Sequence, residues 1–168
     1  MIVTIDGPAG AGKSTVARLL ADRLGFQFLD TGAMYRAVAW AVLEAGQELT
    51  NQSAVVQVAS EIKIRFENDL VYVDAANVTE AIRAREINAA VSEVADNTAV
   101  REKLVDQQRQ IARLGNYVCE GRDQGTVAFP DAECKVFLTA TSNERAQRRF
   151  AQMVEKGIDV SFEEVLTD

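Results

Sequence analysis

Apolar and polar positions along the chain fall into blocks that predict strands and helices in alternation. Short runs typical of buried strands occur at Ile2–Ile5, Phe26–Leu29, Tyr117–Cys119 and Lys135–Leu138. Segments with apolar residues at helical spacing separate these runs, one after residue 14 that ends at Gly25 and others at about 33–45, 86–95 and 100–114. Strands that alternate with helices imply a parallel sheet covered on both faces, so we predict an α/β fold.

The first predicted helix is expected to be amphipathic. Val16, Leu19, Leu20 and Leu24 share one face at helical spacing, and Gly25 is a typical residue for the end of a helix. We therefore expect this face to be the buried one.

The region from about residue 51 to 114 departs from the simple alternation. Ile62–Phe66 alternates in polarity, 67–69 is typical of a turn, and Leu70–Val73 is a second apolar run. These runs predict a β-hairpin that is inserted in an otherwise α/β chain.

Composition narrows the class of protein. The chain has 168 residues, 48% of them hydrophobic and 26% charged, which fits one main globular domain with a small insert. No apolar stretch approaches the ~20 residues of a membrane span, and the chain enters a strand at once, so neither a membrane nor a signal peptide is expected. A net charge of −7 argues against nonspecific binding to nucleic acid.

Cysteine and histidine usage adds two expectations. Cys119 and Cys134 both fall in strand-like runs without a C-x-x-C pattern, so we predict buried, reduced thiols and a cytoplasmic location. Histidine is absent, which excludes a Ser-His or Cys-His nucleophilic mechanism and a histidine metal site.

A glycine-rich segment between the first strand and the first helix carries the clearest functional motif. It fits G-x-x-x-x-G-K-[ST], which binds phosphate in this strand–loop–helix context, and consists of Gly7, Pro8, Ala9, Gly10, Ala11, Gly12, Lys13 and Ser14. The glycines let backbone N–H groups surround a phosphate chain, and the helix N-terminus adds partial positive charge. Lys13 is predicted to reach the outer phosphates and Ser14 to face Mg²⁺, with Thr15 as the neighbouring candidate.

Polar residues also follow two other predicted strands, at 30–32 and 120–123. Because ligands bind at the carboxyl edge of an open α/β sheet, the three segments are expected to line one crevice. The base-reading N-K-x-D of a GTPase is absent, which leaves a small-molecule kinase as the favoured class.

The chain resembles the bacterial-type cytidylate kinases, a family of the nucleoside monophosphate kinase group. The matching segments are T-I-D-G-P at 4–8, L-D-T-G-A-M-Y-R at 29–36, E-G-R-D-Q-G-T-V at 120–127 and F-P-D-A at 129–132. Their order and spacing match over essentially the whole chain. The resemblance implies transfer of the ATP γ-phosphoryl group to CMP or dCMP.

Roles for individual residues follow from this resemblance. Arg36 and Arg122, together with Lys13, are implied as catalytic cations, and the two guanidinium groups suit the phosphate of the acceptor. Thr31 is implied to hydrogen-bond the same phosphate, and Tyr35 to line the ribose.

The resemblance also implies how the base is recognised. The carboxylate of Asp123 suits the amino group at the 4-position of cytosine and repels the carbonyl of uracil. The acceptor atoms of cytosine would be met by donors from Ser92 and Arg101.

Structural alternatives stand beside these roles. Arg101 could belong to a surface ion pair, Ser92 could be a plain helix-surface residue, and Asp123 could pair with Arg122. Asp30 could simply cap the following helix. Three further arginines, at 145, 148 and 149, could form a solvated helix face.

The implied architecture is a three-layer P-loop kinase fold with a central parallel sheet. Residues 1–35 and 116–150 would form the core domain, 36–115 a small α+β monophosphate-binding domain, and 151–168 the start of a lid. The last strand and helix and most of the lid of the family pattern are expected to be missing from this chain. A monomer that binds only small-molecule nucleotides is expected.

Other functions remain open at this point. A related kinase could act on UMP, AMP or an acceptor of the shikimate type, and a nucleotide-binding module without turnover is a third possibility. Ser92, Arg101 and Asp123 are the residues that separate these readings.

The motif makes a direct prediction about Lys13. Lys13→Ala removes the cation that contacts the outer phosphates, so turnover should be abolished while the fold stays intact. A coupled assay together with circular dichroism checks this, and an active variant would remove Lys13 from the mechanism.

Overall fold

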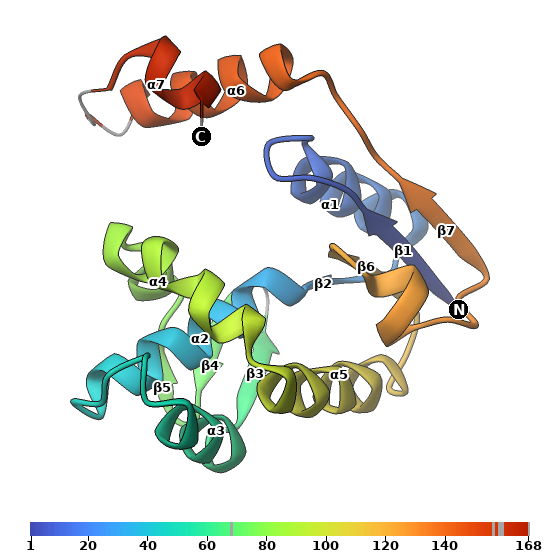
Figure 1. Cartoon of the computed structure of the whole chain (residues 1–168). Coiled ribbons are helices and arrows are strands. Elements are labelled where there is room, and N and C mark those ends of the chain that lie inside the picture. Colours follow the sequence, from blue (N-terminus) through green and yellow to red (C-terminus); the bar gives the residue numbers. More distant parts are fainter. Residues whose placement is uncertain (68, 156, 158–159, 168) are drawn as a thin grey trace.

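A four-stranded parallel sheet forms the centre of the computed structural model, which describes residues 1–67, 69–155, 157 and 160–167 (Figure 1). Its strands are β1 (Ile2–Asp6), β2 (Gln27–Asp30), β6 (Tyr117–Gly121) and β7 (Cys134–Phe137), in the order β2-β6-β1-β7. All three pairings are parallel. The predicted α/β fold is therefore confirmed.

A second, antiparallel sheet of three strands confirms the predicted hairpin. It consists of β3 (Ile64–Glu67), β4 (Leu70–Val73) and β5 (Ala76–Asn77). The sequence pattern did not predict β5, because two residues are too few to show an alternation.

Helices connect the strands and pack against both sheets. They are α1 (Lys13–Leu24), α2 (Thr31–Glu44), α3 (Gln52–Glu61), α4 (Arg85–Asp96), α5 (Thr98–Ala112), α6 (Ser142–Glu155) and α7 (Phe162–Thr167), with a 3₁₀ turn η1 (Ala81–Arg83) and a π-helical turn η2 (Gln124–Ala128). Helix α2 begins directly after β2, so residues 31 and 32 are helical and not a separate turn. None of the helices in the described part of the chain has the length and apolar character needed to cross a membrane.

Two apolar clusters lie on opposite faces of the parallel sheet. Val3, Ile5 and Val118 pack with α1 on one face. The larger cluster centres on α2, where Met34 and Val38 are fully buried, and it extends from the parallel sheet into the antiparallel one. The inserted segment thus shares a continuous core with the sheet, and the domain boundaries at 36 and 116 stay a prediction.

Only part of the predicted apolar face of α1 packs against the sheet, where Leu20 is half-buried. Val16, Leu19 and Leu24 are 43%, 57% and 46% exposed, whereas Ala17 and Ala21 are buried against the sheet. Two alanines one turn apart let the helix backbone approach the sheet closely, which the larger side chains would prevent.

The two cysteines differ in their surroundings, which corrects the expectation for Cys134. Cys119 is fully buried on β6, and burial raises the pKa of its thiol to about 12. Cys134 is exposed on β7, where Phe137 is also 70% exposed. Within the described ranges β7 pairs only with β1 at the edge of the sheet, and all four of its residues are exposed.

Candidate active site

A cavity of about 510 Å³ lies where the carboxyl ends of the parallel strands meet the inserted segment. Its volume is in the usual range for small-ligand pockets. The predicted acceptor-binding residues all line it, namely Thr31, Tyr35, Arg36, Ser92, Arg101, Arg122 and Asp123. The donor side contributes Ala9, Lys13 and Ser14.

The phosphate loop connects β1 to α1 in a conformation that depends on glycine. Gly10 and Gly12 have φ angles of 74° and 92°, a left-handed backbone that other residues rarely adopt. Gly12 is also the N-cap of α1, so the first turn of the helix is directed at the loop. Gly7, Pro8, Gly10, Ala11, Gly12 and Thr15 shape the loop without lining the cavity.

Lys13 lies between the two halves of the cavity. Its Nζ donates to the Pro8 carbonyl at 3.0 Å. Burial lowers the pKa of the lysine, opposed by the charge of Glu120, and the nearby charge of Arg122 lowers it further. The phosphate-loop cation and an acceptor-side cation are therefore close enough to repel each other, which favours an anion between them.

Arg36 and Thr31 project from the first turns of α2 into the cavity. Asp30 accepts the Ala33 N–H at 2.8 Å as the helix cap, and its other oxygen accepts from Arg36 at 3.0 Å. Asp30 thus caps the helix, as one alternative held, and also orients a cavity cation. The Nε of Arg36 is buried and has no hydrogen-bond partner within the described residues.

Thr31, predicted to hydrogen-bond the acceptor phosphate, has a partner within the protein. Its hydroxyl is buried and donates to the carbonyl oxygen of Glu120 at 2.6 Å. The bond fixes the start of α2 against the end of β6, so the two acceptor-side segments are rigidly joined.

Arg101 and Asp123 form an ion pair with each other inside the cavity. Arg101 therefore has an acidic partner, but the pair lines the cavity and is not a surface ion pair. Asp123 pairs with Arg101 and not with Arg122. The pKa of the neighbouring Tyr35 is raised, chiefly by burial. Ser92 is exposed on α4, which fits a plain helix-surface residue. It also borders the cavity, which fits the predicted role in binding the base.

Comparison with known proteins identifies the family. The sequence model for the cytidylate kinase family matches residues 3–168. The chain belongs to the cytidylate kinase family. A cytidylate kinase of Rhodopirellula baltica is 48% identical over 166 residues, which cover 99% of this chain and 72% of that protein.

Two further relatives place the chain in context. A bifunctional pantoate ligase/cytidylate kinase of Trichodesmium erythraeum is 49% identical over 168 residues, covering 98% of this chain and 32% of that protein. The crystal structure of TT1252 from Thermus thermophilus matches with a TM-score of 0.51 and 23% identity, over 99% of this chain and 77% of that one. This last similarity supports the fold.

Glu120 is a cavity residue to which sequence reasoning gave no role in this cytidylate kinase. It is the last but one residue of β6, only 6% exposed, and hydrogen-bonded to Ser14. Burial raises the pKa of its carboxyl, and the charge of Asp30 raises it further. The sequence signal for this role was an acidic residue at the carboxyl end of an otherwise apolar strand. Because β6 pairs with β1, such a residue lies near the phosphate loop.

Two arginines of α6 contact the phosphate loop from outside the cavity. Arg148 donates to the Ala11 carbonyl at 2.9 Å, and Arg145 to the Ala9 carbonyl at 3.4 Å. They hold the loop in place, a role that a solvated helix face would not have. Arg149 is exposed, as that alternative expected.

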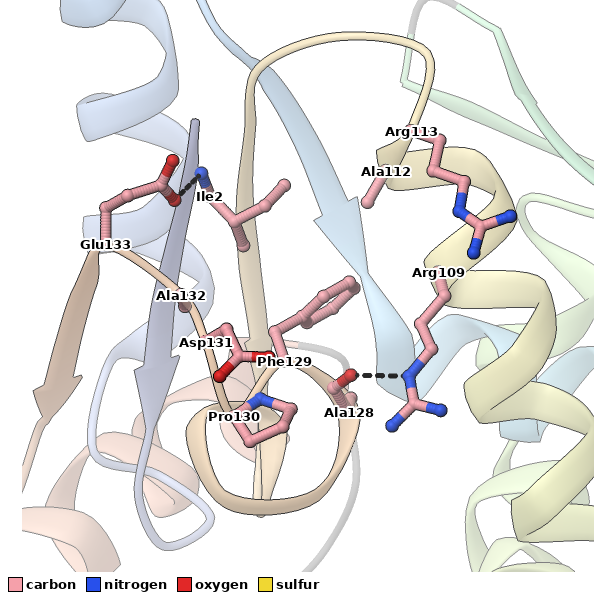
Figure 2. A pocket seen from close by; sticks show the side chains of 10 residues that line it. All are labelled: Ile2, Arg109, Ala112, Arg113, Ala128, Phe129, Pro130, Asp131, Ala132 and Glu133. Carbon is pink, nitrogen blue, oxygen red and sulfur yellow. Dashed lines mark hydrogen bonds between the residues drawn. The ribbon is translucent and has the colours of Figure 1, made fainter.

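A second cavity, of about 400 Å³, lies near the amino ends of the parallel strands (Figure 2). None of the predicted site residues lines it. Several of its polar groups already have partners. Arg109 donates to the Ala128 carbonyl at 2.8 Å, and Glu133 accepts the Ile2 N–H at 2.7 Å. The predicted acceptor-binding residues are therefore gathered in the carboxyl-edge cavity.

Glu120 gives a prediction about pH. Its raised pKa means that the ionised carboxylate costs folding free energy at neutral pH and nothing below about pH 4, where Glu is protonated in both states. Glu120→Gln should therefore be more stable than the wild type at pH 7, with the gain shrinking toward pH 4, while turnover falls roughly 10–100-fold.

Urea unfolding at the two pH values and a coupled assay measure both effects. Glu133→Gln is the control, because the Ile2 N–H lowers the pKa of Glu133 and the stability change should have the opposite sign. A Glu120→Gln protein that is less stable than the wild type at pH 7 would contradict the assignment.

Proposed function

We propose that the carboxyl-edge cavity binds ATP on one side and CMP or dCMP on the other, and transfers the γ-phosphoryl group directly between them. The observation that carries this proposal is the meeting of the phosphate loop with Arg36 and Arg122 in one cavity. Donor and acceptor phosphates are both anionic, so a site that aligns them needs cations on both sides.

The donor half uses the backbone of the phosphate loop and Lys13. The N–H groups at the start of α1 and the ammonium group would surround the β- and γ-phosphates of ATP. Lys13 Nζ donates to the carbonyl oxygen of Pro8 in the phosphate loop. A phosphate bound in that loop would offer an oxygen close by, and Nζ could donate to it instead.

The residues on this side also fit Mg²⁺. The ion prefers oxygen ligands and often keeps several waters, so few protein groups are required. Ser14 and Glu120 place a hydroxyl and a carboxylate next to each other in the cavity. Ser14 is the better candidate than Thr15, which does not line the cavity. When bound, Mg²⁺ would offset charge on the ATP phosphates.

The acceptor half would hold the monophosphate and read the base with separate groups. The guanidinium groups of Arg36 and Arg122 suit the phosphate, close to the hydroxyl of Thr31. Asp123, Arg101 and Ser92 suit cytosine, with Tyr35 beside the ribose.

The inventory of side chains fits direct transfer. The acceptor phosphate attacks the γ-phosphorus in line, the bond to the β–γ bridging oxygen breaks, and ADP leaves with the electron pair. The protein aligns the reactants and offsets charge, so the absence of histidine is no obstacle. We infer that the protein is a cytoplasmic monomer and that its ligands are nucleotides.

The base-reading assignment separates CMP from other acceptors. We expect the full-length protein to prefer CMP and dCMP over UMP, AMP and shikimate, because the Asp123 carboxylate repels the uracil carbonyl. Arg101→Met should raise the KM for CMP by at least about tenfold, with the KM for ATP nearly unchanged, since a hydrogen bond to a charged group is worth ~1.5–3 kcal/mol.

A coupled assay over this acceptor panel decides between the alternatives. Arg113→Met is the matched control, since Arg113 follows α5 at its C-terminal end and lies outside the cavity. A tenfold preference for UMP, or equal loss of CMP and ATP affinity in Arg101→Met, would overturn the base-reading assignment. ATP binding without any acceptor-dependent release of ADP would favour a module without turnover.

A further inference from the structure

We infer that Asp6 is a positioning residue that fixes the loop containing Arg122 and Asp123 at a set distance from the phosphate loop. The inference rests on the proposed function, because it concerns how the two halves of that site are aligned. Asp6 does not line the cavity, so it acts through the segments that it joins.

The carboxylate of Asp6 binds two successive backbone amides. One oxygen accepts the Gln124 N–H at 2.8 Å, and the other accepts the Gly125 N–H, also at 2.8 Å. These amides begin the π-helical turn η2, directly after Asp123. Asp6 is only 7% exposed, so both bonds are shielded from water and strongly favour the observed position of the turn.

The position of Asp6 in the chain explains why these bonds matter. Asp6 is the last residue of β1, and the phosphate loop begins at the next residue. Its Cα is paired in parallel register with Gly121, immediately before Arg122. One residue therefore ends the strand that leads into the donor loop and also holds the acceptor loop by its side chain.

Tight packing leaves the acceptor loop little freedom to adjust. A Cβ added to Gly125 would lie 2.8 Å from the Thr4 hydroxyl oxygen, and one added to Gly121 would lie 2.8 Å from that of Thr31. The loop is thus pressed against β1 and the start of α2. Because the packing couples the residues of the loop to one another, we expect Arg122 and Asp123 to be displaced together when the two bonds to Asp6 are lost.

The geometry also separates this role from that of a metal ligand. Both oxygens of Asp6 accept amides of η2, whereas the side chains of Ser14 and Glu120, which we propose for Mg²⁺, line the cavity. Loss of Asp6 should therefore affect the acceptor far more than ATP.

Asp6→Asn and Asp6→Ala test the inference in the full-length protein. Asparagine is isosteric but presents an N–H to one amide, and alanine removes both bonds. Val3→Ala is the matched control, because it removes buried volume from the same strand without contacting the loop. Catalytic efficiency for the acceptor should fall ~10²-fold in Asp6→Asn, since misplacement by about 1 Å has effects of that size. The KM for ATP should stay within about twofold of the wild-type value.

Amide hydrogen exchange at Gln124 and Gly125 provides a readout that does not depend on the acceptor being CMP. Both amides should exchange at least about tenfold faster in Asp6→Ala than in Val3→Ala, as expected for the loss of a hydrogen bond of ~1.4 kcal/mol or more. If the wild type uses an acceptor other than CMP, the proposed function fails, and the kinetic comparison is made with that acceptor.

Two results would overturn the inference. One is an Asp6→Asn protein that loses stability like Val3→Ala but keeps its acceptor kinetics. The other is an equal loss of ATP and acceptor affinity, which would assign Asp6 to the phosphate loop itself.

Discussion

The parallel pairing of β1 with β6 is the constraint on which the rest of the site depends. It aligns Asp6 with Gly121, so the phosphate loop and the Arg122–Asp123 segment leave the sheet at the same level. The same edge receives α2 from β2, and the Thr31 hydroxyl joins that helix to β6. Catalysis by alignment requires reacting groups held to within fractions of an ångström, and a sheet edge with buried cross-links provides such rigidity.

Several cationic side chains of the cavity are hydrogen-bonded or ion-paired to other groups of the protein. Arg36 pairs with Asp30, Arg101 with Asp123, and Lys13 donates to the Pro8 carbonyl. These contacts satisfy charges that would otherwise be poorly solvated, and in the proposed function a nucleotide would replace some of them with its own oxygens and ring atoms. A ligand gains affinity from breaking these contacts only if it supplies both an anion for the cations and a base edge that matches Arg101 and Asp123. The same contacts would therefore favour the matching nucleotide over others.

The sequence alone predicted much of this arrangement. The phosphate-loop motif, the alternation of strands and helices, and the segments around Arg36 and Arg122 together indicated the α/β fold and the composition of the cavity. Pattern failed where tertiary contact decides: small Ala17 and Ala21 are buried in place of Leu19, and Cys134 lies on an exposed strand. It also left Glu120 without a role and did not foresee the amide contacts of Asp6, because both depend on which strand ends lie side by side.

The central claim is that one cavity aligns two phosphate-bearing ligands. The most direct test is calorimetric titration with a bisubstrate analogue in which adenosine and cytidine are joined 5′ to 5′ by a chain of phosphates. We expect one analogue bound per protein, with competition against both ATP and CMP and an affinity well above that of either nucleotide. Competition with only one of them, or two analogues bound per chain, would show that the two anion-binding regions do not share a site.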